Sequence, residues 1–183
     1  MSMRIQKIRL LIGCVIIGAL VGFGLYAWLT QYYFPVREVA PILYCFEMKD
    51  FMGAEFLISG VCLTPDGQVE LVPGDAPGMF KSRKDPNRIR IRGKGADKVK
   101  HAILMILNSS EDMNVLHGAL CCVISGAVNR NVLFGKQSER EILEKAVARY
   151  NAHIPASGPA GPWSVTADPD GYYYVQMGGF RSQ

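Results

Sequence analysis

Uncharged and mostly apolar residues run without a break from Leu10 to Thr30. At 1.5 Å per residue, a helix over this run covers about 30 Å, which is the thickness of the hydrocarbon core of a bilayer. The pattern therefore predicts one membrane-spanning helix, in an anchor that we assign to residues 10–33.

Charged and aromatic residues flank this anchor in an ordered way. Cations precede the run and amphipathic aromatic rings close it (Arg4, Lys7 and Arg9; Trp28, Tyr32 and Tyr33). Because positive charge is retained on the cytoplasmic side of a membrane, residues 1–9 are expected to be a basic cytoplasmic tail. Residues 34–183 are then expected outside, and we favour a single-pass protein of a bacterial inner membrane with a periplasmic domain.

Two other interpretations of the anchor fit the sequence less well. A cleaved signal peptide has a shorter apolar core and a cleavage site of small residues, whereas this run is longer and ends in bulky aromatic residues. A lipoprotein acylated at Cys14 would present a polar tether after that residue, yet the apolar run continues.

Gly18 and Gly22 have the spacing that lets two membrane helices approach closely, so a homodimer through this face is a hypothesis.

The pattern after the anchor first predicts strands. Val39–Met48 and Ala54–Thr64 are rich in β-branched and aromatic residues. A Pro65-Asp66-Gly67 turn then precedes Gln68–Val72, which alternates polar and apolar residues. The last two segments are therefore expected to form a hairpin.

A second hairpin is expected at the other end of the domain. Trp163–Ala167 and Tyr172–Met177 are separated by Pro169-Asp170-Gly171, which has the same turn chemistry.

Helical periodicity lies between the two hairpins. Ala96–Leu107 places its apolar residues on one stripe, and Ser138 to Glu141 matches a capping box that opens a helix ending near Pro155. Met113–Val128 fits either a helix or a buried strand, because two glycines interrupt an apolar run. The sequence thus predicts an α+β domain with an antiparallel sheet and helices on one face.

Charge is strongly segregated along the chain. The whole chain has 49 % hydrophobic and 20 % charged residues, which excludes a disordered chain, and a formal net charge of +4. Between Lys81 and Lys100, nine cations stand against Asp85 and Asp97 (Lys81, Arg83, Lys84, Arg88, Arg90, Arg92, Lys94, Lys98 and Lys100).

Within that basic stretch, Arg88, Arg90 and Arg92 alternate with two isoleucines, so a strand would present all three guanidinium groups on one face. With Lys94, they are the predicted contact for an acidic protein partner. A solvated edge strand guarded by charge is the plain alternative, and anionic lipids or glycans are further ones. Nucleic acid is not expected, since the location is external and no aromatic residues interleave with the basic ones.

Four cysteines lie beyond the anchor: Cys45, Cys62, Cys121 and Cys122. In an oxidising compartment they are disulfide candidates, with at least one bond expected and its connectivity open. Cys45 and Cys62 fall in neighbouring predicted strands and could pair across the sheet.

Candidate chemistry is sparse. His117 and Cys121 are four residues apart, which on a helix brings an imidazole and a thiol to one side. No metal site and no cofactor are predicted, because the cysteines lack the spacing of zinc or redox pairs. No nucleophile elbow or phosphate-cradling glycine loop is present, so no catalytic residues are assigned.

The sequence therefore favours a membrane-anchored cell-envelope protein that acts by protein–protein interaction. An immunity protein against an exported toxin and a small bitopic subunit of a secretion system are the two forms considered. The alternatives are a thiol-redox or other enzyme using Cys121 or Cys122 with His117, and a glycan- or ligand-binding sensor. In the sensor, Trp163 and Tyr172–Tyr174 would form an aromatic platform, although core packing is the more frequent role of such rings.

Overall fold

The computed structural model describes residues 2–59, 61–63, 69–71, 91–128, 130–154 and 162–178. For residues 2–10, 61–63 and 69–71, the description is limited to the backbone. The Pro65-Asp66-Gly67 turn lies outside the described residues, as do Arg88 and Arg90.

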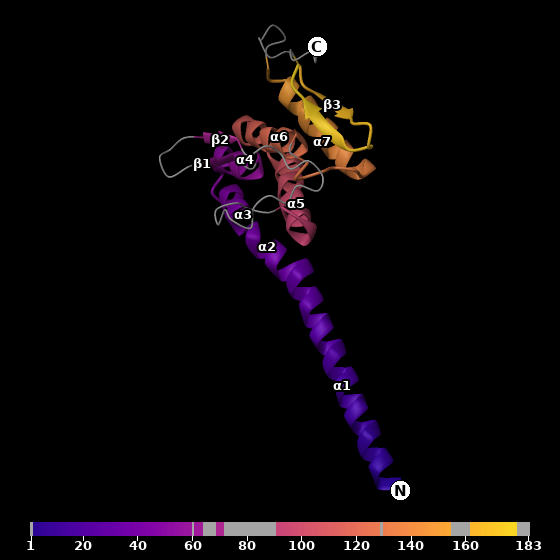
Figure 1. Ribbon diagram of the computed structural model, residues 1–183. Helices are drawn as coiled ribbons and strands as arrows, with labels where there is room; N and C mark the ends of the chain where they lie inside the picture. Colours follow the sequence, from indigo (N-terminus) through magenta and orange to yellow (C-terminus); the bar gives the residue numbers. More distant parts are fainter. Residues whose placement is uncertain are drawn as a thin grey trace.

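One long helix projects from a small helical domain (Figure 1). Helix α1 spans Ser2–Trp28 and continues into a five-residue π-helical segment η1, Leu29–Tyr33, and a short helix α2, Phe34–Glu38. Apolar side chains of α1 are exposed on every side, and the helical stretch is long and apolar enough to cross a membrane. The predicted anchor helix is thus present.

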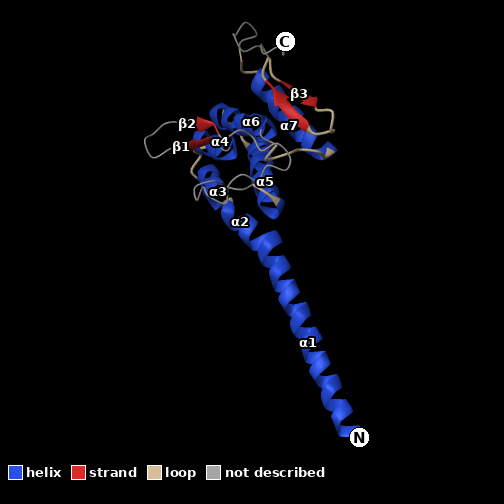
Figure 2. Ribbon diagram, in the orientation of Figure 1, coloured by secondary structure: helices blue, strands red, loops and turns tan. Residues whose placement is uncertain are grey.

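The domain is mostly helical (Figure 2). Its helices are α3 Ala40–Glu47, α4 Phe51–Ser59, α5 Gly93–Ser109, α6 Met113–Val128 and α7 Gln137–Asn151. Helix α4 packs against α3 and α6, and α5 packs against α6 and α7. These helices and the second hairpin enclose one core, whose largest fully buried side chains are Phe134, Ile42, Ile58, Ile103, Leu107, Leu116, Leu120 and Leu143.

The described strands form two separate antiparallel hairpins. Strand β1, Val61–Leu63, pairs with β2, Val69–Leu71, and strand β3, Ser164–Ala167, pairs with β4, Tyr173–Gln176. Both hairpins were predicted. The described residues do not join them into one sheet covered by helices, so only the mixed helix and strand content of the predicted fold class is confirmed.

The strand predictions for Val39–Met48 and Ala54–Thr64 are wrong over most of their length. The chain forms α3 and α4 there, and only β1 remains as a strand. Pro41 in the first turn starts α3, since its missing N–H has no helical partner at that position. Asp50 caps α4 by accepting a hydrogen bond from the Gly53 N–H at 2.9 Å. The apolar residues in these segments indicate a buried face, and a short helix buries an apolar face as well as a strand does.

The helix predictions between the hairpins are confirmed, with one correction at the start of α7. The cap is formed by Glu139 rather than by Ser138 with Glu141. Glu139 is buried, and one carboxylate oxygen accepts from the backbone N–H groups of Gly135 and Lys136 at 2.8 and 3.0 Å. Its other oxygen lies 3.0 Å from the Lys100 ammonium nitrogen. The ambiguous segment Met113–Val128 is the helix α6.

Candidate functional site

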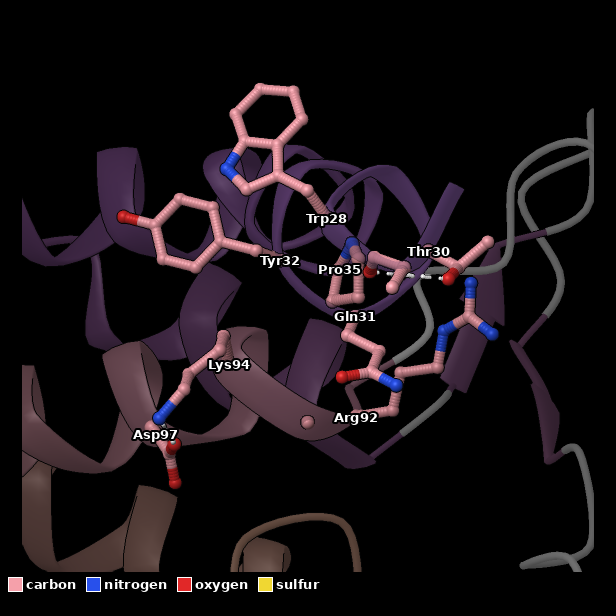
Figure 3. Close-up of a pocket in the computed structure, with 10 residues that line it drawn as sticks. Trp28, Thr30, Gln31, Tyr32, Pro35, Arg92, Lys94 and Asp97 are labelled. Carbon is pink, nitrogen blue, oxygen red and sulfur yellow. Dashed lines mark hydrogen bonds and ion pairs between the residues drawn. The ribbon is translucent and has the colours of Figure 1, made fainter. Parts of the chain in front are cut away.

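The first candidate site is a cavity where the anchor helix meets the domain. It has a volume of about 670 Å³ and is lined by the end of α1, by η1 and α2, and by the start of α5 (Figure 3). Its lining residues from the anchor side include Trp28, Gln31, Tyr32 and Pro35. We call it the juxtamembrane pocket, because α1 is the helix that is long and apolar enough to cross a membrane.

Two of the four predicted partner-binding residues line this pocket. Arg92, the residue before α5, lies 3.4 Å from Glu38 on α2, and Lys94 lies 3.3 Å from Asp97 one turn along α5. Figure 3 shows Lys94 beside Asp97. The Lys94–Asp97 pair is exposed and contributes little to stability. In the other pair Arg92 is exposed, whereas Glu38 is partly buried and its Oε2 atom is buried without a hydrogen-bond partner. Of the predicted strand over Arg88–Arg92, only Ile91 and Arg92 lie within the described residues, and neither is in a strand; Arg92 has an extended backbone and precedes α5.

Glycines bring α5 close to the anchor. A Cβ at Gly95 would overlap the Pro35 carbonyl oxygen, so only glycine lets this first turn of α5 approach α2 so closely. Gly93 has a φ of +48°, a left-handed conformation that favours glycine. The Gly93-Lys94-Gly95 segment therefore serves close packing at the base of the domain.

The second candidate site is a chain of hydrogen bonds on α6 and α7. Cys121 Sγ lies 3.6 Å from His117 Nε2, and His117 Nδ1 lies 2.6 Å from the Tyr150 hydroxyl. Trp163 packs over both, with ring centroids 5.5 Å from His117 and 4.8 Å from Tyr150. The predicted pairing of His117 with Cys121 is confirmed, whereas Tyr150 and Trp163 come from segments that sequence spacing alone does not connect to it.

Burial works against a reactive thiolate at this second site. Desolvation raises the pKa of Cys121 to about 11, and the nearby carboxylate of Glu55 adds to the increase. Burial also raises the pKa of Tyr150, with a smaller contribution from Cys121. The raised pKa favours the protonated thiol at neutral pH, and a protonated thiol is a weak hydrogen-bonding partner of His117.

The other cysteines are also free thiols where they are described. Cys122 is fully buried, its Sγ lies 3.7 Å from the Phe51 carbonyl oxygen, and burial raises its pKa. Cys45 lies on helix α3, so it is not on a strand beside Cys62 as predicted. No disulfide joins Cys45, Cys121 and Cys122, and the side chain of Cys62 lies outside the described residues. Within the described part of the chain, no three His, Cys, Asp or Glu side chains gather in a way that could hold a metal.

A third surface was not predicted from the sequence. Tyr44 and Met48 lie four residues apart at α3, and Met52 and Phe56 lie four residues apart on α4. Their exposed fractions are 61, 62, 69 and 42 %. We call these four residues the α3–α4 apolar stripes. The signal for them is visible only once both segments are known to be helices, because the spacing of four then places each pair on one face.

The remaining predicted features fall in different environments. Gly18 and Gly22 are open, with no atom near the position of an added Cβ, so their face of α1 is free for contact with another helix or with lipid. Trp163 is only 4 % exposed and belongs to the core rather than to an exposed aromatic platform. Tyr173 stacks under the Arg140 guanidinium at 5.4 Å.

Comparison with known proteins supplies no relative: no protein-family model, curated protein or solved structure matches this chain. Function therefore has to be argued from the surfaces described above.

Proposed function

We propose that this chain is a single-pass membrane protein of the bacterial cell envelope whose helical domain acts by binding another protein. The basic residues at the N-terminal end of α1 and the aromatic residues at and after its C-terminal end favour a cytoplasmic N-terminus and a periplasmic domain. The outward-facing side chains of α1 are apolar, which supports anchoring in a bilayer. Outside a bilayer they would form a large apolar surface exposed to water.

The observation that carries the proposal is the exposure of the α3–α4 apolar stripes. Tyr, Phe and Met are the side chains most enriched at protein interfaces, since they bury a large area at low entropic cost and adapt their shape. These four lie at α3 and α4 of the domain and not on α1. A protein partner that covers them would remove apolar surface from water, which favours association.

Charge around the stripes indicates the chemistry of the partner. Within the sequence from Tyr44 to Phe56, Glu47 and Asp50 are exposed anions and Lys49 is the one cation, while Glu55 accepts a hydrogen bond from Ser125 on α6 at 2.9 Å. We therefore expect a partner segment that carries apolar side chains flanked by Lys or Arg. The acidic partner predicted for Arg88, Arg90, Arg92 and Lys94 is a separate prediction, because Arg92 and Lys94 line the juxtamembrane pocket.

Site-specific photocrosslinking tests the proposal in native membranes. A photoreactive phenylalanine analogue is placed at Met52 and, separately, at Phe56, with control positions at the exposed residues Glu141 and Lys145 of α7. We expect the same partner to be crosslinked from both α4 positions and from neither α7 position. A Met52→Glu/Phe56→Glu double variant should lose that partner, whereas Glu141→Gln/Lys145→Gln should keep it.

The identity of the crosslinked protein separates the two forms of the proposal. One exported soluble partner would favour an immunity protein, and a membrane protein would favour a subunit of a secretion assembly. Equal crosslinking from α4 and α7, or retention of the partner by the double Glu variant, would exclude the stripes as the binding surface. Both substituted side chains are exposed, so the fold should survive, and an unchanged thermal unfolding midpoint checks this.

An enzyme that uses Cys121 and His117 is the second candidate, supported by their hydrogen bond and by the contact of Tyr150 with the same imidazole. In such a site His117 would take the thiol proton while Tyr150 holds the ring in place. The raised pKa of Cys121 argues against it. Rapid alkylation of native Cys121 at pH 7, read by peptide mass spectrometry, would favour the enzyme; protection at that pH would remove its nucleophile.

A further inference from the structure

We infer that the juxtamembrane pocket binds the headgroup of an anionic phospholipid. The inference rests on the membrane-spanning role proposed for α1, but it does not depend on the α3–α4 apolar stripes. The pocket lies where α1 gives way to η1, so its depth in the membrane follows from the position of the anchor. Trp28 and Tyr32 line it and are exposed, as expected for rings at the level of lipid headgroups.

The wall of the pocket that comes from the domain is polar and cationic. Arg92 and Lys94 line it together with a single carboxylate, Asp97. Arginine and lysine make charge-assisted hydrogen bonds to phosphate oxygens, which are stronger than neutral ones. Lys94 is paired with the exposed Asp97 at 3.3 Å, a loose pair with which a phosphate entering the pocket would compete well. Arg92 is itself exposed, and its 3.4 Å contact with the partly buried Glu38 leaves further guanidinium donors for a phosphate.

The anchor-side wall suits the rest of a lipid. Trp28 and Tyr32 stack with ring centroids 6.3 Å apart, and with Ala27 and Pro35 they present an apolar surface beside the cationic side chains. Gln31 and Thr30 of η1 add polar groups to the same wall. A lipid has the same division, since its phosphate adjoins glycerol and acyl carbons that lie toward the bilayer.

Rigid packing holds these two walls at a fixed separation. Helix α5 packs against both η1 and α2, and the Gly95 contact with Pro35 removes any side chain from between them. Arg92 and Lys94 thus keep a defined position relative to the end of the anchor. No side chain caps the first turn of α5 within the described residues, so its backbone N–H dipoles add to the positive field of the two side chains.

The sequence just before Arg92 is also basic. Five cations lie between Lys81 and Arg90 with one anion, Asp85. Positive charge near a bilayer surface attracts anionic lipids more strongly than zwitterionic ones. The ligand chemistry is therefore a phosphodiester with net negative charge, and the membrane is its source.

Native mass spectrometry of the full-length protein in detergent tests the inference. The protein is titrated with phosphatidylglycerol and with phosphatidylcholine of the same chain length, and in separate runs with inorganic phosphate as competitor. We expect at least tenfold tighter retention of phosphatidylglycerol and no displacement by millimolar phosphate. An Arg92→Gln/Lys94→Gln variant should lose most of this preference.

A matched variant controls for charge alone. Lys98→Gln/Lys145→Gln also removes two positive charges, but from exposed positions outside the pocket lining. This variant should retain the preference for phosphatidylglycerol. Equal retention of the two lipids by the wild type, or equal loss in both double variants, would overturn the inference. Displacement by inorganic phosphate would assign the pocket to a free anion, and displacement by a glutamate-rich peptide would assign it to an acidic protein partner; either outcome also overturns the lipid assignment.

The lipid test is independent of the partner test. The Met52→Glu/Phe56→Glu variant should lose its crosslinked partner but retain the preference for phosphatidylglycerol. If it loses both, the two surfaces are not separate and the lipid assignment is wrong.

Discussion

Helices α1 and α6 are both apolar, yet their surroundings are opposite. Leu11, Leu20 and Phe23 of α1 are exposed, whereas Leu116, Leu120 and Val123 of α6 are fully buried among α4, α5, α7 and β4. Their lengths differ as well: α1 has 27 residues and α6 has 16, which at 1.5 Å per residue is too short to cross a bilayer of about 30 Å. The length of an apolar helix and the elements available to pack against it, rather than its composition, decide whether it lies in a bilayer or in a protein core.

Their glycines carry the same lesson. Gly18 and Gly22 of α1 have open space where a Cβ would be, while a Cβ at Gly118 of α6 would overlap the Phe51 ring. In α6 the glycine is needed for a close helix contact. In α1 it leaves a smooth face that any helix or lipid can meet.

The largest effect is expected in the core. Leu120→Ala should lower the free energy of unfolding of the domain by about 2–5 kcal/mol, because it removes buried contacts and leaves a cavity. Denaturant unfolding of the full-length protein in detergent measures this. Leu20→Ala is the matched change in α1, and it should shift the domain by less than about 0.5 kcal/mol; equal losses would mean that α1 is packed within the protein.

The converse change introduces a charge into α1. Leu20→Arg lies near the centre of the predicted span and should oppose membrane insertion by about 2.5–3.5 kcal/mol. The fraction that resists alkaline carbonate extraction should fall, while the unfolding midpoint of the domain stays the same. If that fraction is unchanged, Leu20 does not lie at the bilayer centre.

An added methyl group separates the glycines of the two helices. Gly118→Ala should destabilise the domain by about 1–3 kcal/mol, since Phe51 must move away from the new Cβ. Gly18→Ala should leave domain stability unchanged in the same unfolding assay. A neutral Gly118→Ala would show that α4 and α6 can separate without cost.

The smallest effect concerns the pH dependence of Cys121 on α6. Its pKa is raised from an ordinary value of 9.0 to about 11, so the folded state holds this proton more tightly than the unfolded state does. The stabilisation from this group is therefore complete below pH 9 and is lost as pH rises towards 11. Alkylation of native Cys121, followed by peptide mass spectrometry, should reach half its maximal rate near pH 11.

Protein unfolded in urea provides the reference for that measurement. Its Cys121 should reach half its maximal alkylation rate about two pH units lower, near the ordinary thiol value. A native profile at or below the unfolded one would mean that His117 activates the thiol, and the enzyme hypothesis would then gain over protein binding.

Local sequence was sufficient where one segment carries its own signal. The uninterrupted apolar run predicted α1, the apolar stripe of Ala96–Leu107 predicted α5, and the proline and glycine turn predicted the β3–β4 hairpin. It was also enough for the contact of His117 with Cys121, because residues four apart on a helix must lie on one side.

Local sequence patterns predicted the wrong element where an apolar segment can be buried either as a helix or as a strand. Val39–Met48 holds β-branched and aromatic residues, but Val39, Ile42 and Phe46 are the ones buried, at helical spacing. Pro41 and Asp50 were the available helix-start signals. β-propensity mostly measures fit to a half-buried sheet surface, and no broad sheet exists among the described residues to provide that surface.

The sequence by itself determined a membrane-length helix, the periodic helices and the tight turns, because each depends on neighbours within a few residues. Only the tertiary structure decided that Tyr150 meets His117, that Arg92 and Lys94 line a pocket beside Trp28, and that the α3–α4 apolar stripes remain exposed. The first two features join segments far apart in the chain, and the third depends on which surfaces the rest of the domain leaves uncovered. They arise because α5 and α6 had to pack against α2 and α4 to bury the core, which no local pattern encodes.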